Sequence, residues 1–155
     1  MDYLILREIG MIARCFNSIS DIEFREINLA KGQYLFLVRV CENPGINQEM
    51  LSNMLKVDRT TTAKAVKKLE ERDYIIRKSS EKDKRAFELY PGEKAKEIYP
   101  FLRREEDFSA DTALIGFSVT EKELLYSLIK RMRTNIEKDW TVVKNGEKRG
   151  YLDTK

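Results

Sequence analysis

Residues 46–89 read INQEMLSNMLKVDRTTTAKAVKKLEERDYIIRKSSEKDKRAFEL. The segment holds two short helical patterns joined by a turn at residues 56–58, and two extended segments around a polar turn follow at once. Asn47 is placed to cap the first helix, and Asp58 to cap the second, which runs to about Asp73. Two helices and a charged hairpin in this order predict a winged helix-turn-helix.

The second helix of this pair has two dissimilar faces. Thr62, Val66 and Leu69 are spaced by four and three residues and form the side that packs. The other side carries hydroxyl and cationic groups, as a helix that reads a DNA groove must. We expect the DNA-contacting residues of this recognition helix to be Arg59, Thr60, Thr61, Lys64, Lys67 and Lys68. Arg59, near the helix start, is well placed for a phosphate, and the division of the others between bases and phosphates stays open.

Positive charge is concentrated in this part of the chain. Between Lys56 and Arg85 there are eleven basic and six acidic residues, a local net charge of +5 against +3 for all 155 residues. The residues outside this window therefore sum to −2. A cationic surface confined to one region suits a polyanion such as DNA. The hairpin, whose tip carries Lys84 and Arg85, can lie along the DNA backbone or enter a minor groove.

The composition argues against several other classes of protein. The chain contains no histidine and only two cysteines, so neither a structural zinc site nor the commonest general base is available. No glycine-rich phosphate loop or nucleophile elbow is present. We therefore expect no enzymatic activity, no metal and no cofactor. Acids on the amphipathic helices are interpreted as solvated faces.

Length and hydropathy favour one cytoplasmic domain. No apolar run approaches the roughly 18 residues of a membrane helix, and charged residues interrupt the N-terminal segment, so neither a membrane partner nor a secretory signal is expected. Two cysteines do not make a disulfide framework, which suits a reducing cytoplasm. We expect one domain over residues 1–140, with the winged core at about 30–92, and a frayed polar tail over residues 141–155.

Apolar helices flank the core on both sides. The first, at about 2–20, carries an apolar seam, and a buried helix from Tyr34 to Cys41 follows it. Two more helices are expected at about 93–108 and 119–140, joined by a linker at 109–116, with a kink or break at Pro100 and a capping box of Thr120 and Glu123. An apolar helix at a chain end either docks on the core or pairs with a second subunit, and both can hold. The residues that a subunit interface would use are Ile5, Ile9, Ile12, Phe16, Leu125, Leu128, Met132 and Ile136.

Taken in this order, the chain resembles the MarR (multiple antibiotic resistance regulator) family of transcription factors over about residues 2–140. The resemblance is carried by three groups of residues: Val57, Asp58, Arg59, Thr60 and Thr61 at the start of the recognition helix, Leu69 and Glu70 near its end, and Asp83, Lys84, Arg85, Ala86 and Leu89 in the wing. Asp73 stands where the family usually has a glycine. The fold implied is mainly helical with a small β-hairpin wing, flanked by N- and C-terminal dimerisation helices.

The resemblance also implies roles for residues and partners. Arg85 is the residue expected in the minor groove, Asp83 its organiser, and the wing site as a whole is Lys82, Asp83, Lys84 and Arg85. The family pattern implies a homodimer on double-stranded DNA, acting as a repressor that a small phenolic or anionic effector releases. Two subunits then place two recognition helices about one DNA turn (~34 Å) apart on a near-palindromic operator.

Three alternatives stay open at this level. The lysines of the recognition helix could form a solvated face, with the wing binding another protein instead of DNA. Cys15 could be a redox-sensing thiol beside Arg14, although a small packing residue is the simpler interpretation for Cys15 and Cys41. Aromatic residues of the first two helices could line an effector cleft, or belong to the core: Tyr3, Phe16, Tyr34 and Phe36.

Overall fold

The computed structural model describes residues 1–29, 32–81 and 86–152. The chain divides into two compact units, Met1–Ser109 and Ala110–Lys155. The elements in order are α1 (Asp2–Glu23), α2 (Gln33–Glu42), β1 (Ile46–Asn47), α3 (Gln48–Leu55), α4 (Arg59–Glu70), β2 (Ile75–Ser79), β3 (Phe87–Pro91), α5 (Glu93–Ala113), α6 (Val119–Lys144) and a 3-10 turn at Gly150–Leu152. The expected fold class, helical with a small winged sheet, is confirmed.

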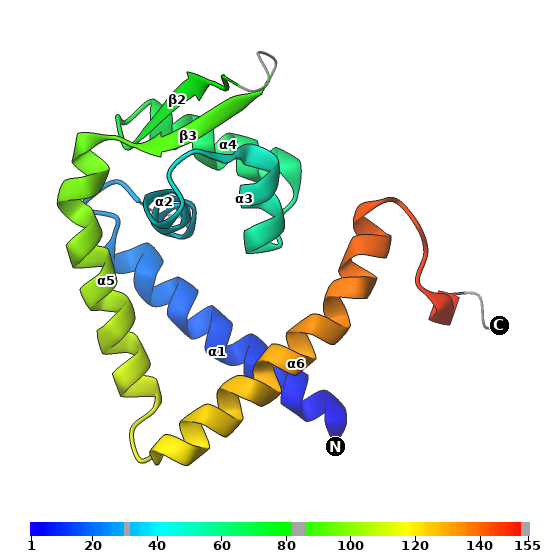
Figure 1. Cartoon of the computed structure of the whole chain (residues 1–155). Coiled ribbons are helices and arrows are strands. Elements are labelled where there is room, and N and C mark those ends of the chain that lie inside the picture. Colours follow the sequence, from blue (N-terminus) through cyan, green and yellow to red (C-terminus); the bar gives the residue numbers. More distant parts are fainter. Residues whose placement is uncertain (30–31, 82–85, 153–155) are drawn as a thin grey trace. The chain divides into compact units, whose positions relative to one another are not determined.

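The core of the first unit is built around α2. This helix packs against α3, α4 and β3 (Figure 1). Leu37 and Val40 of α2 are fully buried, as are Leu51 of α3, Val66 of α4 and Leu102 of α5. These branched side chains exclude water from the junction of the helices, so the helix-turn-helix has a fixed geometry.

A three-stranded antiparallel sheet in the order β1–β3–β2 covers this core. The β2–β3 hairpin has the expected position, with Arg77 opposite Leu89. The two-residue strand β1 was not expected; it pairs Ile46 with Leu89 and Asn47 with Glu88. This pairing fixes the base of the wing to the residue that precedes α3.

The turns that position α4 use left-handed backbone at residues other than glycine. Lys56, between α3 and α4, has φ 55°, and Asp73, between α4 and β2, has φ 62°. Glycine is the residue that adopts this conformation without steric cost, so Lys56 and Asp73 both stand where the backbone favours a glycine. Beside Asp73, Gly92 lies so close that a Cβ atom there would be 2.5 Å from the Asp73 carbonyl oxygen.

Helix α5 differs from the expectation at two places. It continues through Pro100, so the helix is not broken there, and the kink given as the alternative stays a prediction. Pro100 is exposed, and water can therefore satisfy the carbonyl that loses its amide donor. The helix also runs to Ala113, so the first five residues of the predicted 109–116 linker are helical.

In the second unit, the N-cap of α6 lies two residues before the predicted one. The box consists of Ser118 and Glu121: the Ser118 amide donates to the Glu121 carboxylate over 2.8 Å, and the Glu121 amide donates back to Ser118 Oγ over 3.3 Å. The Ser118 amide and hydroxyl both donate to the Glu121 carboxylate, and these two hydrogen bonds lower the pKa of Glu121. The prediction of Thr120 and Glu123 was wrong because two such patterns overlap here, and the earlier one follows the turn at Gly116 (φ 83°) directly.

The residues after 140 are more ordered than predicted. Helix α6 extends to Lys144, and Arg149 then forms an ion pair with Asp139, with Nη2 to Oδ2 at 2.7 Å. This contact places Arg149 beside α6 through an ion pair between exposed side chains. None of the helices described here is long and apolar enough to cross a membrane.

Candidate nucleic-acid interface

The faces of α4 are divided as the spacing predicted. Thr62, Val66 and Leu69 are fully buried against the core. Thr60, Lys64, Lys67 and Lys68 are exposed on the other side of the helix. One helix therefore packs through hydroxyl and branched apolar groups and offers hydroxyl and ammonium groups to solvent.

Asp58 fixes the start of this helix. Its Oδ1 accepts the Thr61 amide over 2.8 Å, and its Oδ2 accepts the Thr61 hydroxyl over 2.6 Å. Because these hydrogen bonds favour the ionised carboxylate, they lower the pKa of Asp58. From the buried side, the Thr62 hydroxyl donates to the Asp58 carbonyl over 2.9 Å. Thr61, predicted to contact DNA, thus already donates its hydroxyl within the cap.

Two of the predicted DNA-binding cations form ion pairs within the protein. Arg59 donates to Glu49 of α3 over 2.5 Å, which connects the starts of the two helices of the motif. Lys67 lies 3.8 Å from Glu71, one turn later. Both pairs are exposed, with 59% or more of each side chain accessible, and such pairs exchange partners at little cost. A DNA phosphate can therefore replace either carboxylate.

Lys64 and Lys68 form the remaining cationic surface of α4. Within the described ranges, neither lysine has an ion pair. They lie four residues apart, so their ammonium groups share one side of the helix with Thr60. This side is where an anion gains most, because no internal carboxylate has to be displaced.

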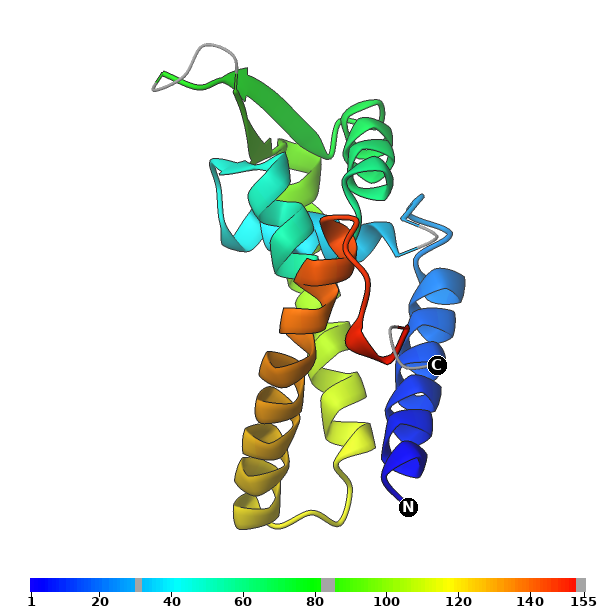
Figure 2. The same ribbon diagram turned by 90° about the vertical axis from the view of Figure 1, so that its right-hand side faces the viewer.

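The wing lies beside α4 at one end of the first unit (Figure 2). The predicted tip residues Lys82, Asp83, Lys84 and Arg85 lie outside the described residues. On the described part of the hairpin, Arg77 and Lys78 of β2 are exposed cations that were not among the predicted DNA contacts. Arg77 binds Glu70, the last residue of α4, through two hydrogen bonds of 3.1 and 2.7 Å. No periodicity in the sequence indicates this pairing, since its partners belong to different elements.

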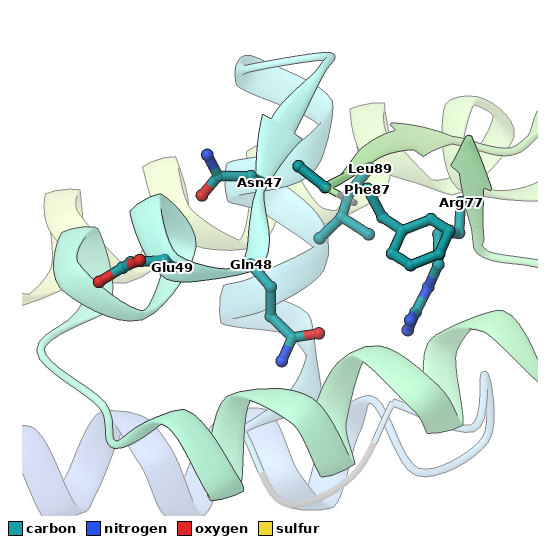
Figure 3. A pocket seen from close by; sticks show the side chains of 7 residues that line it. Asn47, Gln48, Glu49, Arg77, Phe87 and Leu89 are labelled. Atoms are coloured by element: carbon teal, nitrogen blue, oxygen red, sulfur yellow. The ribbon is translucent and has the colours of Figure 1, made fainter. Parts of the chain in front are cut away.

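A pocket of about 330 Å³ lies at the junction of α3 and the sheet. Figure 3 shows Gln48 and Arg77 projecting to the same side of it, with the Phe87 ring beside Arg77. The pocket is lined by Asn47, Gln48, Glu49, Arg77, Ala86, Phe87 and Leu89. Asn47 also caps α3 by accepting the Met50 amide over 2.8 Å, as predicted.

The residues predicted for dimerisation belong to both units. On α1, Ile5 and Ile12 are about half exposed, and Ile9 and Phe16 are partly buried. On α6, which has no buried residue, Leu125, Leu128 and Ile136 are exposed and Met132 is partly buried. Among the residues that the structure describes, most of these apolar side chains stay open to solvent.

The remaining candidates are the aromatic residues considered for an effector cleft and the two cysteines. Tyr34 and Phe36 are buried in the core, whereas Tyr3 is exposed. Cys15 is exposed on α1; Cys41 is half-buried, and burial raises the pKa of its thiol to about 11. A raised pKa disfavours the thiolate, which agrees with the interpretation of Cys41 as a packing residue. The described residues contain no group of three or more side chains suited to a metal ion.

The fold and this surface define a winged helix-turn-helix protein of the transcription-regulator class. A family model described as the MarR family matches residues 29–87. A curated relative, the uncharacterized HTH-type transcriptional regulator YybA of Bacillus subtilis (strain 168), is 55% identical over 147 residues, which cover 95% of this chain and 98% of that protein. The chain belongs to the MarR family. Since the family consists of transcriptional regulators, the expectation that the protein is not an enzyme is confirmed.

Solved structures agree with this assignment. A putative MarR family transcriptional regulator from Listeria monocytogenes, crystallised in complex with 26mer DNA, has 49% identity and a TM-score of 0.92, and the match covers 94% of this chain and 97% of that one. The crystal structure of the transcriptional regulator SlyA has 51% identity and a TM-score of 0.87, with 90% and 98% covered.

Proposed function

We propose that this protein is a sequence-specific, DNA-binding transcriptional regulator that inserts α4 into a major groove. The observation that carries the proposal is the division of α4, whose exposed side presents Thr60, Lys64 and Lys68 while its buried side is fixed to the core. Arg59 and Lys67, in exposed pairs with carboxylates, are further phosphate contacts in this arrangement. The Listeria relative crystallised with DNA supports the choice of ligand.

The wing is proposed to contact the neighbouring minor groove. On the family pattern, Arg85 enters this groove, Asp83 holds the arginine, and Lys82 and Lys84 meet the backbone phosphates. A narrow minor groove has an enhanced negative potential, which favours an inserted arginine. The exposed cation Lys78 adds positive charge along the same hairpin.

We further propose that the protein acts as a homodimer through α1, α5 and α6. The exposed apolar side chains on α1 and α6 supply the physical reason, because a second copy would remove them from water. The matched test replaces Leu128 with glutamate and, as a control, the exposed Lys130 of the same helix with glutamate. We expect sedimentation to show a monomer only for Leu128→Glu; a monomeric wild-type chain would contradict the proposal.

Regulation is proposed to be repression that a small phenolic or anionic effector relieves. In this mechanism the protein occupies a near-palindromic operator in the cytoplasm, and the effector favours a spacing of the two recognition helices that no longer fits one DNA turn. A ligand shifts this equilibrium only if it binds one arrangement more tightly. A compound that raises the melting temperature but leaves operator affinity unchanged would count against this step.

Selection of bound sequences from a random pool of duplexes tests the proposed function. We expect a near-palindromic consensus for the wild type, loss of binding for Arg85→Ala, and unchanged binding for Lys148→Ala in the C-terminal segment. Failure to retain any duplex at low salt would instead favour a winged-helix module that binds another protein. DNA binding that hydrogen peroxide abolishes only when Cys15 is present would indicate redox sensing through the exposed thiol.

A further inference from the structure

An ion pair with two hydrogen bonds joins the end of α4 to the middle of β2. Arg77 Nε donates to Glu70 Oε1 over 3.1 Å, and Arg77 Nη2 donates to Glu70 Oε2 over 2.7 Å. Arg77 also places its guanidinium carbon 5.4 Å from the centroid of the Phe87 ring on β3. The side chains of Arg77 and Glu70 are 33% and 28% exposed, so the pair is partly shielded from solvent. A planar guanidinium in a two-point contact fixes orientation as well as distance.

The backbone restrains the hairpin along β3, where β1 pairs with Leu89 and Glu88 and the Gly45 amide donates to the Leu89 carbonyl over 2.8 Å, and also at its base. The Tyr74 amide donates to the Leu69 carbonyl over 2.9 Å, and the Gly92 amide donates to the Tyr74 carbonyl over 2.9 Å. Both bonds lie where β2 begins and β3 ends. Arg77 is the third residue of β2, the edge strand away from β1, so its contact with Glu70 adds a direct link between the wing and the end of α4.

We propose that Glu70 and Arg77 are positioning residues that set the angle between the wing and the recognition helix. The inference rests on the proposed DNA binding, in which α4 and the wing contact adjacent grooves at the same time. A fixed angle makes the second contact effectively intramolecular, and loss of the angle lowers affinity without removing any DNA contact. Because Arg77 forms an ion pair with Glu70, we do not assign Arg77 as a phosphate contact.

Three variants test whether Arg77 positions the wing or contacts DNA directly. Arg77→Gln and Glu70→Gln are each expected to weaken binding to the selected duplex by roughly fivefold. The exchanged pair Glu70→Arg with Arg77→Glu restores most of the affinity, because the ion pair re-forms with opposite polarity. For Arg77→Gln, the slope of log affinity against log salt stays at the wild-type value. A slope smaller by about 0.9, or an exchanged pair no better than the single variants, would make Arg77 a phosphate contact and overturn the proposal.

Hydrogen exchange of the free protein provides a readout that needs no DNA. We expect faster exchange of the β2–β3 amides in Arg77→Gln and recovery of protection in the exchanged pair. The matched control is Arg39→Gln, which removes the Arg39–Glu42 pair of α2, with a distance of 2.6 Å and exposures of 34% and 30%. This control should leave both hairpin exchange and DNA affinity unchanged. Unaltered hairpin exchange in Arg77→Gln would refute the positioning role.

The two proposals fail in different ways. If the wild type binds no duplex at low salt, the proposed function fails, and hydrogen exchange still decides whether the ion pair holds the wing. If the wild type binds DNA and the Arg77 and Glu70 variants bind it equally well, only the positioning role fails.

Discussion

Adjacent residues of α4, Lys68 and Leu69, should separate stability from DNA binding. Leu69 is fully buried between the helices of the first unit, whereas Lys68 is exposed on the face assigned to DNA. Leu69→Ala removes apolar contacts and leaves a cavity, which costs about 3 kcal/mol of the free energy of unfolding. With a denaturant slope of about 2 kcal/mol per molar urea, the unfolding midpoint should fall by roughly 1.5 M.

Lys68→Ala should weaken DNA binding and leave the stability of the fold almost unchanged. An exposed substitution of this kind changes the free energy of unfolding by no more than about 0.5 kcal/mol, so its urea midpoint should match that of the wild type. Its affinity for the selected duplex should fall, since one phosphate contact is lost.

The assay is urea unfolding followed by circular dichroism at one protein concentration, because the stability of an oligomer depends on concentration. Duplex titration is then carried out in buffer where both variants are folded. The reasoning would be refuted if Lys68→Ala moved the midpoint as far as Leu69→Ala, or if folded Leu69→Ala lost more DNA affinity than Lys68→Ala.

Three further outcomes follow from the geometry. Gly92→Ala should lower the melting temperature, because its Cβ would meet the Asp73 carbonyl oxygen. Asp73→Gly should be neutral or stabilising, because φ is 62° at that residue. Calorimetry of the two variants measures both effects. Cys15 should react with iodoacetamide at pH 8 much faster than Cys41, because a thiol pKa of about 11 leaves roughly one part in a thousand as thiolate, and equal rates in peptide mapping would contradict this. The folded pKa of Asp58 lies below its ordinary 3.8, so the stabilisation from its helix cap is complete above that value and is lost as the pH falls through the folded pKa; NMR titration of the carboxyl carbon should give a midpoint below 3.8.

Local patterns in the sequence predicted the parts of the site that depend on local chemistry. The caps of α3 and α4 were predicted correctly at Asn47 and Asp58, because a cap involves only the next three residues. The buried face of α4 was also predicted, since Val66 and Leu69 repeat at the helical period and burial follows that period.

Features that depend on tertiary contacts were not predictable in this way. Strand β1 has only two residues, and it exists because Ile46 pairs with Leu89, far along the chain. The Glu70–Arg77 pair likewise joins the end of a helix to a strand, where neither the helical nor the strand period applies. In the sequence Arg77 is one of many cations, and no local pattern indicates that it contacts Glu70 of α4.

At two places the local pattern allowed more than one structure. Two serine or threonine residues, each three before a glutamate, compete to cap α6, and the choice of Ser118 over Thr120 depends on where the preceding turn ends. A proline inside a helical pattern indicates a lost hydrogen bond but not whether solvent compensates for it, and exposed Pro100 remains within α5.

The central claim, that the exposed side of α4 is the DNA interface, is tested most directly by the salt dependence of binding. Fluorescence anisotropy of the selected duplex should be measured from low to moderate salt for the wild type, for Lys64→Ala with Lys68→Ala, and for Lys148→Ala as the control. We predict that the double variant lowers the slope of log affinity against log salt by about 1.8, or 0.9 for each lost phosphate contact, and that the control leaves it unchanged. A double variant with the affinity and slope of the wild type would contradict the claim.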